Sequence, residues 1–203
     1  MNIFNRHTLA AGFASAALIL PGCAQAEPVS YEPEPTHSYI RATYTHMGLS
    51  RQSIEFIGLE GTFNLDTETP ENSEIDVTVG IDNLVTVPGG EEFVTHLSSA
   101  DFFNVEEFPE ANFVLTSLEQ DTDTTGTMTG DLTIHGVTQP VTFDVTLNYE
   151  GTHPMMSDFT ALGVSATTQI LRSDFGIDMY VPYVSDEVDL EIQLELISPI
   201  AAE

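Results

Sequence analysis

The stretch 130–151 has the clearest pattern in the sequence and constrains the fold more than any other. Its second arm, 141–149, has an apolar side chain at every other position up to and including Tyr149. Alternation with a period of two predicts a β-strand with one apolar and one polar face. The central segment, 135–140, contains a glycine and a proline, so we interpret it as the connection of a β-hairpin, with Pro140 at the start of the second strand.

Similar alternation recurs along the rest of the chain. It predicts further strands at 37–44, 54–66, 74–87, 113–120, 127–134, 162–172 and 188–197. The best helix candidate is 91–100, which opens with acidic residues and repeats apolar ones at helical spacing. The apolar, non-periodic segments 101–104 and 108–109 are predicted to cap one end of the fold. About eight long strands with one or two short helices in loops indicate an all-β antiparallel protein. Strands of this kind close naturally into a barrel that can hold a small ligand.

The first 26 residues predict a secretory signal peptide. Its apolar run, 8–20, is too short to cross a bilayer as a helix, which needs about 20 residues. Cleavage after Ala26 would release a free periplasmic protein, and acylation of Cys23 would retain an anchored lipoprotein. The free form is favoured because Pro21 fits a lipoprotein box poorly. We therefore expect a periplasmic protein without a transmembrane segment.

The mature chain is expected to have two parts. Residues 27–36 are rich in proline and glutamate and are predicted to form a linker or an extended arm, and 37–203 form the barrel domain. Cys23 is the only cysteine, so the domain is expected to fold without an internal disulfide. The sequence leaves the oligomeric state open, with a homodimer as one option.

The charge of the chain is strongly negative. The formal net charge is −28, with 32 acidic and 4 basic residues, and removing the leader with Arg6 leaves 3 − 32 = −29. Such a surface repels phosphate groups, so nucleic acid is excluded as a partner. Two interpretations remain: the charge serves solubility, for example at high salt, or it docks a basic partner or a cation.

Short motifs occur along most of the chain. They are His37-Ser38, His46-x-Gly48, Phe63-x-x-Asp66, His96-Leu-Ser98 with Asp101-Phe-Phe103, Phe108-Pro109 before Phe113, GDLTIHGVTQPV at 130–141, RSDFG at 172–176 and VSDEV at 184–188. In this order and spacing the set resembles the YceI-like family of bacterial periplasmic polyisoprenoid-binding proteins. One departure is that Phe93 and Val94 stand where the family usually has an acidic residue. The resemblance implies an extended, lipocalin-like, eight-stranded antiparallel barrel. It would enclose a long isoprenoid chain, such as that of an isoprenoid quinone or a polyprenyl lipid.

The apolar faces of the predicted strands, the predicted helix and the capping segment supply the candidate lumen. Its residues are Ile54, Phe56, Phe63, Val77, Val79, Ile81, Leu97, Phe102, Phe103, Phe113, Leu115, Leu132, Ile134, Phe143, Val145, Leu147, Val164, Ile170, Leu190 and Ile192. Burial of a prenyl chain contributes about 0.8 kcal/mol per CH₂, so a dry tunnel is enough to bind it. The residues alone favour a barrel filled by its own side chains. The resemblance favours an open lumen.

Three polar residues are candidate contacts at the ends of the lumen: His46, Arg172 and Asp174. Arg172 is one of three basic residues after the leader and ends an apolar strand. It would either form an ion pair that joins the strand to its loop or contact the head group of a ligand.

Catalytic and metal chemistry have weak support in the sequence. The five histidines after the leader lie far apart and have no cysteine beside them, and no nucleophile–base set is present. We therefore predict a binding protein rather than an enzyme, with no metal and no catalytic cofactor. The alternatives are an enzyme that acts on a quinone or lipid through a histidine, and an acidic structural or stress-related envelope protein.

Overall fold

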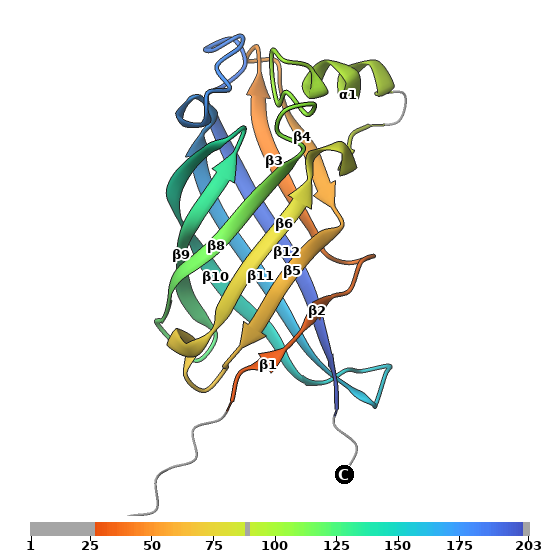
Figure 1. The fold of residues 1–203 in the computed structure, drawn as a ribbon, viewed down its shortest axis with the longest axis vertical. Helices are drawn as coiled ribbons and strands as arrows, with labels where there is room; N and C mark the ends of the chain where they lie inside the picture. Colours follow the sequence, from red (N-terminus) through yellow and green to blue (C-terminus); the bar gives the residue numbers. More distant parts are fainter. Residues whose placement is uncertain (1–26, 88–89, 201–203) are drawn as a thin grey trace, which may run out of the picture.

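The computed structural model describes residues 27–87 and 90–200, so the predicted leader and Cys23 lie outside the described residues. The described chain forms one strongly curled antiparallel sheet (Figure 1). Its strands are β1 (Val29–Ser30), β2 (Glu32–Pro33), β3 (Tyr39–His46), β4 (Ser50–Ile57), β5 (Leu59–Leu65), β6 (Glu74–Gly80), β7 (Leu84–Val85), β8 (Glu110–Gln120), β9 (Thr125–Ile134), β10 (Val137–Thr152), β11 (Phe159–Leu171) and β12 (Glu187–Pro199). The helix α1 (Glu91–Ser98) and the 3₁₀ turns η1 (Pro70–Asn72), η2 (Ile81–Asn83) and η3 (Arg172–Phe175) lie in the connections.

The all-β class and the antiparallel barrel are confirmed, while the number of strands differs. The described residues form nine strands of seven or more residues and three of two residues, where about eight long strands were predicted. The order is β1-β5-β6-β8-β9-β10-β11-β12-β3-β4-β7, and β2 pairs with β12 beside this path. None of the described helices is both long enough and apolar enough to span a membrane.

The number of strands differs first at Gly58, where the single predicted strand 54–66 is divided into β4 and β5. Gly58 has a φ of 73°, a conformation that breaks the strand and favours glycine. Before it, β4 pairs with β3, and after it, β5 pairs with β6. Because β4 and β5 lie near opposite ends of the strand order, this corner brings the two ends of the sheet together and curls it into a barrel. The predicted strand 74–87 also ends early, at Gly80, and continues as η2 and the short β7.

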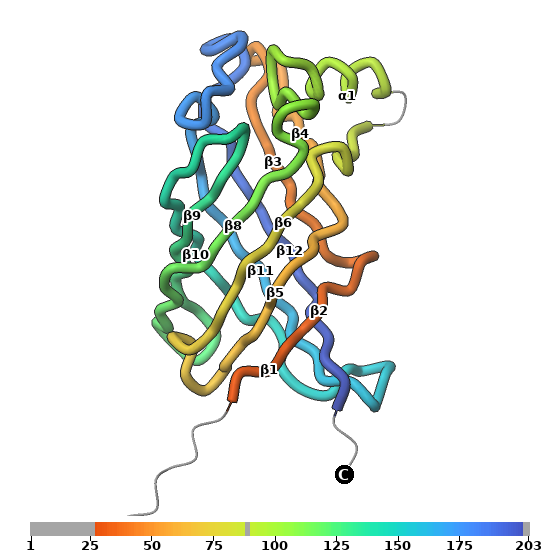
Figure 2. Tube along the Cα trace, in the orientation of Figure 1, coloured from red at the N-terminus to blue at the C-terminus, as the bar shows by residue number. Residues whose placement is uncertain are grey.

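The N-terminal arm also helps to close the barrel. β1 pairs with β5 and β2 pairs with β12, so the arm joins two strands that do not pair with each other (Figure 2). Tyr31, between β1 and β2, is only 8% exposed and packs in the core. Of the two interpretations of 27–36, the extended arm is therefore the one that the structure shows.

The β9–β10 hairpin is longer and its turn tighter than predicted. The turn contains only His135 and Gly136, with φ of 52° and 73°, as a two-residue hairpin turn requires. Pro140 lies inside β10, opposite Asp131, and not in the connection. It is tolerated because the pairing of β10 with β11 begins only at Asp144, which leaves β10 one unpaired edge at Pro140.

A bulge in β10 ends the predicted inward stripe of this hairpin before Tyr149. The pairing of β10 with β11 shifts between Leu147 and Tyr149. Since such a shift changes the face of every following side chain, Tyr149 is 41% exposed and does not continue the inward stripe.

Candidate ligand-binding cavity

The barrel encloses a cavity of about 720 Å³. Side chains from β3 to β6 and from β8 to β12 line it, and most of them are isoleucine, valine, leucine or phenylalanine. Its volume lies within the range of about 300–1,000 Å³ that is typical of small-molecule sites. The barrel is therefore not filled by its own side chains.

The structure brings the predicted lumen residues together around this cavity, with one exception. All of them line the cavity apart from Leu115, which is half-buried. The pairing of β8 with β9 shifts between Leu115 and Ser117, and after the shift Leu118 lines the cavity. The bulge could not be recognised from the alternation, which continues through Ser117 in the sequence. That these side chains bind a ligand stays a prediction.

Several lining residues were missed by the sequence prediction. Some continue a stripe that alternation had already placed on one face, and these could have been found: Ile40, Ala42, Leu162, Ala166, Val188, Leu194 and Leu196. Others, such as Tyr180 and Val184, lie in loops without periodicity, where alternation gives no information about the face of a residue.

The upper end of the cavity, beside α1 in Figure 1, is aromatic. The rings of His96, Phe102 and Tyr180 form a group with centroids 4.8 to 6.3 Å apart. His46, a predicted end contact, lines the same region and pairs through its backbone with Val184. This end therefore offers flat apolar surfaces together with imidazole and phenol groups.

Arg172 lines the cavity but does not form the ion pair that was one of its two predicted roles. Its guanidinium donates hydrogen bonds of 2.9 to 3.0 Å to four backbone carbonyls, and it has no ion-pair partner among the described residues. The carbonyls belong to Ile177, Met179, Val184 and Ser185. Burial lowers the pKa of Arg172, and the nearby carboxylates of Asp186 and Asp178 oppose this effect. Arg172 thus fixes the loop 177–185 at the upper end.

Asp174 is not at the cavity. It is exposed, and its backbone carbonyl accepts a hydrogen bond from Gln139. The residue lies in η3, whose turn directs it outward while Arg172 and Phe175 are buried. The structure therefore does not place Asp174 among the residues that line the cavity, because the 3₁₀ turn η3 directs it outward.

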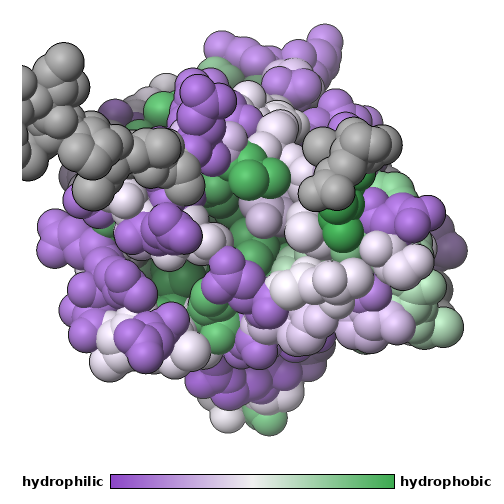
Figure 3. Space-filling view, turned by 90° about the horizontal axis from the view of Figure 1, so that it is seen from below, coloured by the Kyte–Doolittle hydropathy of each residue, from purple (hydrophilic) through white to green (hydrophobic). Residues whose placement is uncertain are grey.

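The lower end of the cavity is acidic. Asp66, Glu119, Asp123 and Glu150 line it, and Figure 3 shows a hydrophobic recess there within a largely hydrophilic rim. Asp66 accepts hydrogen bonds from the side chain of Asn72 and from two backbone N–H groups, which together lower its pKa. The two ends of the cavity therefore differ in chemistry.

The comparisons with known proteins agree with this architecture. The family model of the YceI-like domain matches residues 31–196. The chain belongs to the YceI-like family. A UPF0312 protein of Pseudomonas putida is 36% identical to this YceI-like chain over 190 residues, which are 94% of the chain and 96% of the relative. A UPF0312 protein of Pseudomonas fluorescens is 37% identical over the same shares.

Solved structures share the fold of this YceI-like protein. The Campylobacter jejuni YceI protein matches with a TM-score of 0.68 and 26% identity, over 76% of this chain and 89% of that one. BcnA of Burkholderia cenocepacia matches with a TM-score of 0.68 and 19% identity, over 82% of this chain and 99% of that one. A polyisoprenoid-binding domain of Saccharophagus degradans matches with a TM-score of 0.59 and 11% identity, over 86% of this chain and 100% of that one. At 19% and 11% identity, the last two support the fold alone.

Proposed function

We propose that this protein binds a long isoprenoid chain in its lumen, for transport, storage or metabolism of the lipid in the periplasm. The observation that carries the proposal is the apolar cavity of about 720 Å³ that runs between two chemically different ends. Each buried CH₂ of a ligand contributes about 0.8 kcal/mol, so the Ile, Val, Leu and Phe side chains of the wall are sufficient to hold a prenyl tail.

The character of the two ends favours a quinone over a polyprenyl phosphate. An anionic head at the lower end would meet the carboxylates of Asp66, Glu119, Asp123 and Glu150. At the upper end, a neutral quinone ring can stack on the aromatic group and accept hydrogen bonds from His96 or Tyr180. Arg172 offers little to a phosphate there, because four of its hydrogen bonds already go to carbonyls.

A binding role accounts for the cavity better than catalysis does. Besides the apolar wall, the upper end presents His46, His96 and Tyr180, which suit recognition of a head group. The Saccharophagus degradans neighbour is described as a polyisoprenoid-binding domain, in line with this role.

The test is to purify the protein from its native envelope and to identify the bound lipid by native mass spectrometry and solvent extraction. We expect one prenyl lipid per chain, with an isoprenoid quinone as the main species. An empty lumen after gentle purification, together with failure to take up added quinone, would refute the proposal. The same spectrum reads the N-terminus, which separates cleavage after Ala26 from acylation of Cys23 and thus tests the proposed free periplasmic form.

A further inference from the structure

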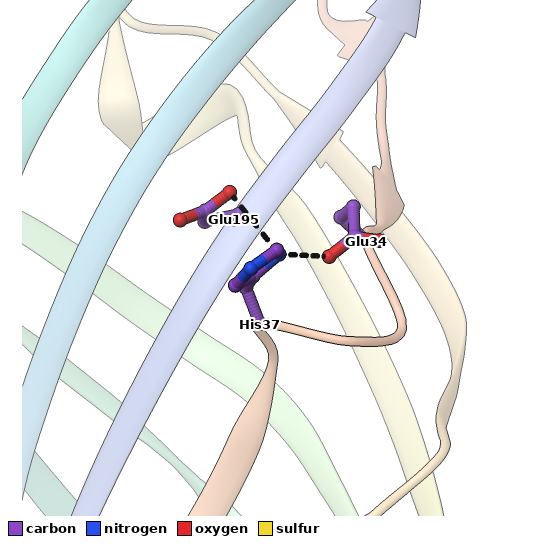
Figure 4. A group of neighbouring side chains, drawn as sticks. All are labelled: Glu34, His37 and Glu195. Atoms are coloured by element: carbon purple, nitrogen blue, oxygen red, sulfur yellow. Dashed lines mark hydrogen bonds and ion pairs between the residues drawn. The ribbon is translucent and has the colours of Figure 1, made fainter.

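Three side chains that can bind a metal ion meet on the outside of the barrel, away from the cavity. Glu34 and His37 lie in the connection between β2 and β3, and Glu195 lies on β12 (Figure 4). The Nδ1 atom of His37 is 2.6 Å from a carboxylate oxygen of Glu34 and 3.8 Å from one of Glu195. All three ligand atoms lie within 4.8 Å of one another. The sequence could not reveal this group, because Glu195 is close to the C-terminal end of the chain and the other two are close to its start.

The spacing of these atoms fits a small divalent ion. Zinc binds nitrogen and oxygen at about 2.0–2.1 Å, so neighbouring ligand atoms in a tetrahedral site are about 3.3 Å apart. The two distances from His37 lie on either side of this value. Modest rotations of Glu34 and Glu195 would equalise them, and their side chains are 22% and 53% exposed.

The backbone beneath the three side chains is well ordered by hydrogen bonds. The N–H of Glu34 donates to the carbonyl of Glu195 at 2.7 Å. The hydroxyl of Ser38, a residue only 3% exposed, accepts the N–H of Glu195 at 3.2 Å. The ligand-bearing positions are therefore held together before any ion binds, which reduces the entropic cost of binding.

The charge and the donor types indicate which ion would bind. The chain is strongly anionic, with 32 acidic residues against 4 basic ones, and it attracts cations. One imidazole with two carboxylates suits zinc or a similar transition-metal ion, whereas calcium and magnesium take oxygen ligands.

We propose that Glu34, His37 and Glu195 form a binding site for a divalent transition-metal ion such as Zn²⁺, with water completing the coordination. The ion joins the N-terminal arm to β12, next to the contact of β2 with β12 that helps to close the barrel. Metal binding then stabilises the closed arm. In this structure the Nδ1 atom of His37 forms hydrogen bonds with Glu34, at 2.6 Å, and with the hydroxyl of Thr36, at 3.0 Å.

The experiment is a calorimetric titration of zinc chloride into the protein, purified without a histidine tag. We expect one zinc ion per chain and a higher melting temperature with zinc. His37→Ala and Glu195→Gln should each weaken binding about tenfold or more, because each removes a metal ligand. Glu187→Gln is the matched control, since it removes an exposed carboxylate from the same strand, and it should leave zinc binding unchanged.

Three results would overturn the proposal. They are the absence of zinc binding, the weak binding of several ions that His37→Ala does not affect, and an equal loss of affinity in Glu187→Gln and Glu195→Gln. The last two would mean that zinc associates with the acidic surface in general. Because no ligand of this site lines the cavity, the outcome is independent of the lipid-binding proposal.

Discussion

The two ends of the cavity are closed by different means and expose different chemistry. At the upper end, α1, the segment after it and the loop fixed by Arg172 cover the barrel with aromatic side chains. At the lower end, the turns after β5 and β8 contribute lining residues, and several of the side chains at the opening are acidic. The same wall of apolar side chains connects the two ends. Under the lipid-binding function proposed above, the wall would therefore provide affinity for a tail, while the ends would determine which head group is accepted and where it lies.

The largest effect is expected in the shared wall. Phe143 is 2% exposed and packs edge-on against Phe113 with ring centroids 5.6 Å apart. Phe143→Asp should prevent folding or abolish lipid retention, because loss of a buried phenylalanine alone costs about 3–5 kcal/mol and a buried carboxylate adds to this. Thr142→Asp, on the exposed face of the same strand, is the control for the added charge. Circular dichroism and lipid extraction measure both effects, and full lipid retention in a folded Phe143→Asp variant would mean that the wall is assigned to the wrong face.

The next effect concerns the upper end alone. Arg172→Met keeps much of the side-chain volume but leaves four carbonyls of the loop 177–185 without their donor. We expect a loss of about 3 kcal/mol or more in the free energy of unfolding, measured with urea, since unpaired buried groups are costly. Hydrogen exchange should increase first in this loop. If hydrogen exchange in the loop is unchanged and the loss of stability is spread over the barrel, Arg172 does not hold the loop at the upper end in place.

The wall was more predictable from the sequence than either end. Strand alternation reports the face of each residue directly, so the apolar stripe that contains Leu132 and Ile134 could be assigned to the inner face of the barrel from the sequence alone. Bulges interrupt that periodicity without a sequence signature, as Leu115 and Tyr149 show. The ends depend on loops, where the conformation follows from tertiary hydrogen bonds. Arg172 could be recognised as unusual, but not as a donor to four carbonyls.

At the lower end, the expected effect depends on pH. The pKa of Asp66 is lowered in the folded state, chiefly by the hydrogen bond from the side chain of Asn72. A carboxyl with a lowered pKa stabilises the fold above its unfolded pKa of about 3.9, and this contribution disappears as pH falls through the folded value. Asp66→Asn should therefore reduce the urea midpoint at pH 7, and this effect should become smaller as the pH falls below the unfolded pKa of about 3.9. If the urea midpoints of Asp66→Asn and of the unchanged protein differ by the same amount at every pH, the charge of Asp66 contributes nothing to stability.

The smallest effect on stability, and the most specific effect on binding, is expected at Tyr180. This residue is 51% exposed and lines the upper end, whereas Tyr183 in the same loop is 73% exposed and does not line the cavity. Tyr180→Ala should change the free energy of unfolding by no more than about 0.5 kcal/mol. It should weaken quinone binding about two- to tenfold, as expected from the loss of one aromatic contact of about 0.5–1.5 kcal/mol. A prenyl alcohol, which has the tail without the ring, should bind Tyr180→Ala and the unchanged protein equally well. Tyr183→Ala is the control and should bind both ligands normally. If Tyr180→Ala instead weakens both ligands to the same degree, the upper end contacts the tail, and the head group then lies at the acidic end.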